Sequence, residues 1–210
     1  MSGGTEKWYR RFADVPDIGY QGSPGVDRTR LPGHNVVPEI SYYNFEGKHR
    51  VSMMWPMKDG STSASPANTW ETKPSKGEIH AETLLRNLHE KLELPGTLSD
   101  YHFAIQHCHG ELGQHAREAF WIYEEIERLC WLDITLIEKY PVTITDEYGG
   151  ERTYYGVTAF HKLIDMYEKE GYIREALKVA QIAKRFEQDT GKVEELRERI
   201  ASVEAEKDAV

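Results

Sequence analysis

Large and small apolar residues repeat at helical spacing between residues 159 and 186. The large ones are Phe160, Leu163, Ile164 and Tyr167, and the small ones are Ala176, Ala180 and Ala183. Spacings of three and four residues place each set on one face of an α-helix. Gly171 separates the two sets, as expected for a turn. The pattern therefore predicts two short helices packed face to face.

A helix is also predicted after residue 75. Ser75 and Glu78 have the spacing of a capping box, in which two side chains bind free amides of the first helical turn. We expect this helix to run to Glu93, with Ile79, Leu85, Leu88 and Leu92 on one apolar face and its polar residues in water. Those polar residues are Glu82, Arg86, His89 and Glu90.

The next two predicted helices form a hairpin around Gly113. The first runs from Ser99 to Leu112, with Tyr101, Ile105, Cys108 and Leu112 on its buried stripe. The second runs from His115 to Tyr140 and buries Ala116, Ala119, Phe120, Tyr123, Ile126, Cys130 and Ile134. Further apolar residues lie off that face of the second helix. We therefore expect several neighbours to cover it and place it at the centre of the fold.

Residues 192–206 form the last predicted helix. Its apolar stripe consists of Val193, Leu196, Ile200 and Val203, under a coat of charged residues. One apolar face and one polar face suit a helix that caps a stack. The same spacing over two heptads also fits a dimer seam, so a homodimer through this helix is the alternative.

Residues 1–75 contrast with this helical part. They hold seven of the nine prolines and eight of the 17 glycines, which disfavours long helices. Two β-prone runs flank Glu46-Gly47 between Ile40 and Trp55 and predict a β-hairpin, and residues 60–68 are interpreted as a flexible connector. We expect the large aromatic residues of this arm to pack onto the helices, with an exposed partner surface as the alternative.

The predicted fold is mainly α, with stacked antiparallel helical hairpins. The helical domain spans residues 76–210 and carries an insertion at residues 141–157, interpreted as a short β-hairpin or a long loop. A loop-rich arm, residues 1–75, precedes it.

Charge narrows the choice of partner. The formal net charge is -9, and it is concentrated in residues 76–210, which hold 17 Lys or Arg against 27 Asp or Glu. An acidic helical part repels phosphate backbones and anionic membranes, so neither nucleic acid nor a membrane is expected as a partner. No apolar run reaches the ~18 residues of a membrane span, and the first residues lack the apolar core of a signal peptide, which favours a cytoplasmic protein. The two cysteines, Cys108 and Cys130, fit a reducing compartment, with a disulfide between them left open.

The helical hairpin at residues 158–188 resembles a tetratricopeptide repeat. The match is carried by Leu163, Tyr167, Gly171, Ala176 and Ala183, with departures at Ile164, Ala180 and Gln188. A fainter echo covers residues 101–128. The resemblance implies hairpins stacked into a right-handed superhelix, with a concave surface, formed by the first helix of each hairpin, that binds peptides. Carried onto this chain, that surface presents His161, Asp165, Glu168 and Lys169.

Two groups of polar residues are candidates for chemistry. His102, His107, His109 and His115 lie within 14 residues, and Glu124, Glu125, Glu127 and Asp133 follow them. His102 and His109 share a helix face but are too far apart along the axis for one ion, so we interpret the histidines as residues of a polar face. Acidic faces are likewise common on helices. No HExxH, CxxC, GxGxxG, GxxxxGK[ST] or GxSxG motif occurs, so no catalytic residue, metal or cofactor is predicted.

These observations favour a non-enzymatic interaction or scaffold protein that binds a protein or peptide partner. Two alternatives remain open. One is a metal-dependent enzyme that uses the histidines from His102 to His115. The other is an accessory subunit of a larger complex, in which the aromatic arm makes the contact.

Overall fold

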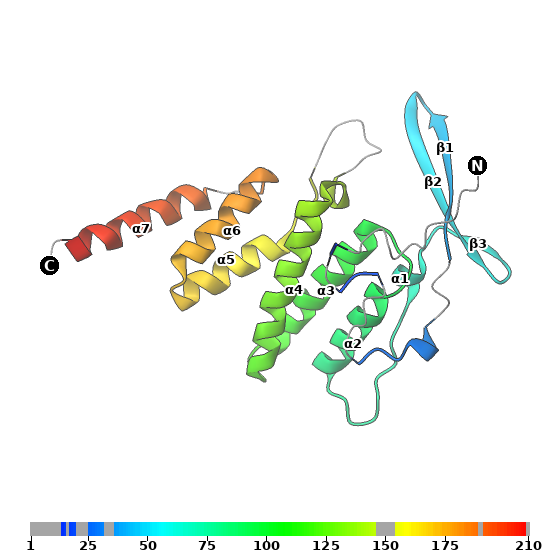
Figure 1. Cartoon of the computed structure of the whole chain (residues 1–210), viewed down its shortest axis with the longest axis horizontal. Helices are drawn as coiled ribbons and strands as arrows, with labels where there is room; N and C mark the ends of the chain where they lie inside the picture. Colours follow the sequence, from blue (N-terminus) through cyan, green and yellow to red (C-terminus); the bar gives the residue numbers. More distant parts are fainter. Residues whose placement is uncertain are drawn as a thin grey trace. The chain divides into compact units, whose positions relative to one another are not determined.

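The computed structural model describes residues 14–15, 17–19, 25–31, 36–145, 154–188 and 191–208, and only the backbone of residues 48–50 and 206–208. The chain divides into two compact units, Met1–Arg152 and Thr153–Val210. The described residues form seven α-helices and a three-stranded antiparallel sheet (Figure 1). The predicted mainly helical fold, with helices packed in pairs and strands near the N-terminal end, is confirmed. The predicted boundary at residue 75 falls inside the first unit.

The predicted β-hairpin is present in the first unit. Strands β1 (Glu39–Phe45) and β2 (Lys48–Met57) pair antiparallel, with Phe45 opposite Lys48. Glu46 and Gly47 connect them with φ values of 49° and 76°, and two positive φ values are what a tight type I′ turn requires. The turn therefore fixes the register of the ribbon.

Residues 60–68 are ordered into short elements, so their assignment to a flexible connector was wrong. Strand β3 (Gly60–Thr62) pairs with the end of β2. Helix α1 (Pro66–Thr69) follows, and the Ser65 hydroxyl accepts a hydrogen bond from the Asn68 amide at 3.0 Å. Serine serves here as a helix cap, which composition alone does not distinguish from a linker.

Three longer helices complete the first unit: α2 (His80–Leu92), α3 (Leu98–His115) and α4 (Phe120–Lys139), followed by the 3₁₀ helix η3 (Pro141–Ile144). A short 3₁₀ helix, η2 (Arg28–Arg30), precedes the sheet. Helix α3 packs against α1, α2, α4 and η3 and lies between α2 and α4 (Figure 1). The central helix of this unit is therefore α3, not the predicted helix at residues 115–140. The predicted stripe of α3 is confirmed, since all four of its residues are buried.

The helix starts differ from the prediction for local reasons. The Glu78 carboxylate accepts the Ser75 amide as predicted, but Gly77 has φ +82°, which turns the chain so that α2 begins only at His80. Thr97 and Asp100 form a capping box that starts α3, and this helix continues through Gly113. Phe120, predicted to be buried, is 73% exposed at the first turn of α4.

Buried carboxylates attach the N-terminal segments to α2. Glu90, predicted to face water, is fully buried and accepts hydrogen bonds from the Trp70 indole at 2.7 Å and from the Thr72 hydroxyl. Arg28 forms an ion pair of 2.5 Å with the buried Glu93. Trp55 is also buried, which confirms that this aromatic residue packs inward. Trp8, Tyr9 and Phe12 lie outside the described residues.

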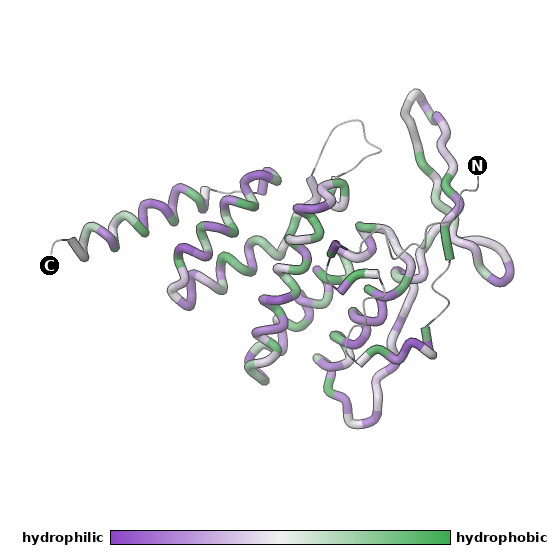
Figure 2. The backbone as a smooth tube through the Cα atoms, in the orientation of Figure 1, coloured by the Kyte–Doolittle hydropathy of each residue, from purple (hydrophilic) through white to green (hydrophobic). Residues whose placement is uncertain are grey.

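The second unit consists of α5 (Thr158–Glu170), α6 (Ile173–Arg185) and α7 (Lys192–Asp208). Gly171, with φ 84°, ends α5 and allows the predicted hairpin. Figure 2 shows hydrophobic and hydrophilic residues alternating along these helices. Helix α7 runs antiparallel to α6, because Lys184 pairs with Glu194 at 2.9 Å and Arg174 pairs with Glu204 at 2.6 Å. Of the predicted insertion, residues 141–144 form η3 and residues 146–153 lie outside the described residues.

Candidate protein-interaction site

Three of the four residues predicted to contact a partner are exposed on α5. His161, Asp165 and Lys169 follow each other at intervals of four residues, so they form one stripe on the solvent side of the helix. The structure brings these three side chains into one row, and they do not line either of the two hollows described below. Their role as partner contacts stays a prediction.

The fourth predicted residue, Glu168, joins α5 to α7. Its carboxylate pairs with Lys192 at 3.0 Å and with Arg199 at 3.2 Å, and its side chain is only 15% exposed. The carboxylates of Glu195 and Glu168 raise the pKa of Lys192 because each accepts a hydrogen bond from its ammonium group. Glu168 therefore contributes to the position of α7.

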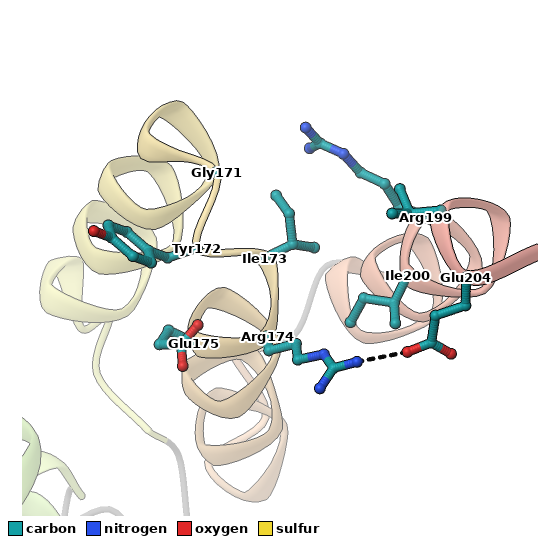
Figure 3. Close-up of a pocket in the computed structure, with 9 residues that line it drawn as sticks. Gly171, Tyr172, Ile173, Arg174, Glu175, Arg199, Ile200 and Glu204 are labelled. Atoms are coloured by element: carbon teal, nitrogen blue, oxygen red, sulfur yellow. Dashed lines mark hydrogen bonds and ion pairs between the residues drawn. The ribbon is translucent and has the colours of Figure 1, made fainter. Parts of the chain in front are cut away.

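A groove of about 400 Å³ opens between the first turn of α6 and the second half of α7. Ile173 and Ile200 extend from the two helices that border it, and Arg174 reaches across to Glu204 (Figure 3). Val203, 48% exposed, adds apolar surface on the α7 side, and Tyr172, 55% exposed, lies at the α5–α6 turn. This groove is therefore the hollow of the second unit considered as a candidate site.

The apolar stripe of α7 becomes more exposed toward the C-terminal end of the helix. Val193 and Leu196 are buried, Ile200 is half-buried and Val203 is exposed. The pairs Lys184–Glu194 and Arg174–Glu204 place Ile200 and Val203 beside the first half of α6. The sequence predicted all four residues as one packing face, and the exposure of Val203 differs from that prediction.

The charges around the groove balance one another. Arg174 pairs with Glu204, Arg199 with Glu168, and Glu175 with Lys178 at 3.6 Å. Exposed ion pairs of this kind contribute little to stability, about 0–1 kcal/mol each. The charged residues that line the groove therefore balance one another, and Ile173, Ile200 and Val203 supply its apolar lining.

The histidines of α3 do not form the predicted polar face. His102 and His109 are fully buried, and His102 Nδ1 lies 2.7 Å from Oδ1 of Asp133 on α4. His115 faces Glu118 at 2.7 Å, and His107 is exposed. Among the residues that the structure describes, no group of three or more His, Cys, Asp or Glu side chains is placed to hold a metal ion. The metal-dependent enzyme stays an untested alternative.

The two cysteines are buried core residues. Cys108 and Cys130 are both free thiols, so the disulfide left open by the sequence is not formed. Burial raises the pKa of Cys108 to about 12, which keeps its thiol protonated at neutral pH. A protonated, enclosed thiol is a poor nucleophile.

A second hollow, of about 590 Å³, lies in the first unit beside the start of α3. Several of the polar side chains that line this hollow form hydrogen bonds that start α3 or join α3 to neighbouring segments. Thr97 and Asp100 cap α3, Asn68 donates to Asp100 at 3.0 Å, and Ser99 donates to the Thr143 carbonyl at 3.1 Å. These polar side chains therefore serve to hold α3 in place.

Comparisons with protein families, with characterised proteins and with solved structures find no match to this chain. Among the described residues, no helix has an apolar stretch long enough to cross a lipid bilayer. The proposal for function therefore rests on the surfaces described above.

Proposed function

We propose that this chain is a non-enzymatic interaction protein whose second unit binds a helix of a partner protein in the groove between α6 and α7. The observation that carries this proposal is the apolar stripe of α7, which continues from the packed Val193 and Leu196 into the open Ile200 and Val203. A surface that is packed along half of its length and open along the rest is suited to receive another helix.

As part of the same proposal, we propose that the second unit is similar to a tetratricopeptide repeat. Three consecutive antiparallel helices, α5 to α7, follow the order expected of one hairpin plus the first helix of the next. In a stack of that kind, the helix after α7 would pack against α7 near the groove. A partner helix in the groove would make the same kind of helix–helix contact with α7.

The partner segment is expected to be amphipathic. An apolar floor requires apolar residues at positions i, i+3 or i+4 and i+7, as in other helix-in-groove complexes. The rim has two arginines and two glutamates among its lining residues, so it attracts neither a strongly basic nor a strongly acidic helix. Nucleic acid remains a disfavoured partner, because a rim with balanced charges does not attract phosphate groups.

A displayed library of random peptides, selected on the immobilised full chain, tests the proposal. Enriched peptides are expected to share the i, i+3/i+4, i+7 apolar pattern. The variant Val203→Glu places a carboxylate in the groove and should weaken binding of an enriched peptide about tenfold or more, which corresponds to ~1.4 kcal/mol.

The matched control is Ser202→Glu, which adds the same charge to an exposed position of α7 that does not line the groove. Its binding should equal that of the unmodified chain. Enriched peptides that bind Val203→Glu as tightly as Ser202→Glu would contradict the groove as the site, and so would a selection that enriches no helical pattern.

A further inference from the structure

Strand β1 is exposed along its whole length. All seven of its residues, Glu39 to Phe45, are exposed, including Ile40, Tyr42, Tyr43 and Phe45. Tyr42 is 79% exposed and Phe45 57%. Large apolar side chains on both faces of a ribbon are unusual unless another surface covers them.

One edge of this strand is also free to pair. In a two-residue hairpin, the residues that flank the turn form a hydrogen-bonded pair, here Phe45 with Lys48. The alternation along the strand then directs the backbone N–H and C=O groups of Ile40, Tyr42 and Asn44 away from β2. In the sheet order β1-β2-β3, no described strand lies on that side of β1.

Nothing in β1 protects this edge. Proteins commonly guard an open edge with lysine, with proline inside the strand or with a β-bulge. Between Glu39 and Phe45 there is no lysine, arginine or proline, and the register with β2 is continuous. Strand β3 pairs only with Trp55–Met57 at the end of β2, so most of the β1–β2 ribbon has two strands, an arrangement that further strands stabilise.

We infer that the β1 edge pairs with β1 of a second copy of this chain, antiparallel, about a twofold axis at Tyr42. The two three-stranded sheets then form one six-stranded sheet in which Tyr42 lies opposite Tyr42 of the second copy. Ile40 lies opposite Asn44, and Ser41 opposite Tyr43. The same segment supplies both sides of the interface, as in most symmetric dimers.

Charge favours this antiparallel pair of identical strands. Glu39 is the single charged residue of β1. In the twofold arrangement it lies opposite Phe45, and the two Glu39 residues are about 20 Å apart at 3.4 Å per residue. A parallel pairing of the two copies would place them side by side, where like charges repel.

Disulfide trapping tests the register. The Cα atoms of a directly opposite hydrogen-bonded pair are about 5.5 Å apart, within the ~4.4–6.8 Å that a disulfide spans. Tyr42→Cys should therefore form a covalent dimer in a glutathione redox buffer. Asn44→Cys is the matched control, because its two copies would be about 14 Å apart at 3.4 Å per residue. The native Cys108 and Cys130 are buried and do not compete.

Sedimentation equilibrium of the full chain gives the second readout. The unmodified chain should have the mass of two chains, Tyr42→Pro the mass of one, and Tyr42→Thr the mass of two. Proline removes the outward N–H while leaving the pairing with β2 possible, and threonine keeps that N–H. A monomeric unmodified chain would overturn the inference and leave the edge to a strand of another protein. Equal trapping of Tyr42→Cys and Asn44→Cys, or a Tyr42→Pro variant that remains dimeric, would also overturn it.

Discussion

The buried pair between His102 on α3 and Asp133 on α4 provides a quantitative test of the packing in the first unit. Both side chains are fully buried, and one contact of 2.7 Å joins them. Within the described part of the chain, Nε2 of His102 and Oδ2 of Asp133 have no hydrogen-bond partner. The pair therefore makes only some of the hydrogen bonds that its polar atoms could form. Removing one side chain should lower the stability more than removing both, because a single deletion leaves the other polar group buried without its partner.

The expected magnitudes follow from that arrangement. Asp133→Ala leaves the His102 ring buried without its partner and should lower the free energy of unfolding by about 1–3 kcal/mol. The double variant His102→Leu with Asp133→Ala removes both polar groups and keeps the summed volume nearly constant. It should unfold within about 1 kcal/mol of the unmodified chain.

Urea unfolding, monitored by tryptophan fluorescence, measures this difference in the free energy of unfolding of the first unit. All five tryptophans precede residue 153, so their emission reports the first unit alone. His107→Leu makes a matched control, since it is an exposed histidine on the same helix and should change stability by less than ~0.5 kcal/mol. If the double variant is as unstable as Asp133→Ala, the pair is not the unit of stabilisation and the reasoning fails.

Three further predictions concern single residues. Gly171→Ala should lower the stability of the second unit by about 1 kcal/mol, measured by circular dichroism during thermal unfolding, because φ 84° strains any residue with a Cβ and no atom lies near to compensate. Burial raises the pKa of Asp133, so the folded chain keeps a proton that the unfolded chain loses above pH ~3.8. The contribution of Asp133 to the stability is therefore complete below pH ~3.8 and is lost as the pH rises through the raised pKa of Asp133. In urea titrations at several pH values, Asp133→Asn should therefore show a smaller loss of stability with rising pH than the unmodified chain. Cys108, with a pKa of about 12, should react with a thiol reagent at pH 8 only as fast as the first unit opens, which mass spectrometry can follow.

Periodicity predicted the helices because their apolar stripes contact neighbouring helices directly. The stripe of α3 through Tyr101 and Leu112 and the α5–α6 hairpin around Gly171 are examples. Helix starts were missed where one backbone angle decides them, as the positive φ of Gly77 does for α2. Hydropathy does not encode that angle.

The burial of polar residues depends on partners far away in sequence. Glu90 was placed in water, yet Trp70 and Thr72 reach it from the segment that precedes α2. His102 is buried because Asp133, 31 residues later, faces it from α4. The hydropathy pattern of one helix does not reveal such partners on other segments. For the same reason, the hydropathy pattern of α7 does not show that Val203 is exposed at the end of its stripe.

Hydrogen–deuterium exchange tests the proposed binding groove most directly. The full chain is measured alone and with a peptide from the selection described above. We expect slower exchange in the first turn of α6 and around Ile200 to Glu204 of α7, with unchanged exchange in α2 to α4. Slower exchange elsewhere, with no change at α6 and α7, would contradict the groove as the binding site.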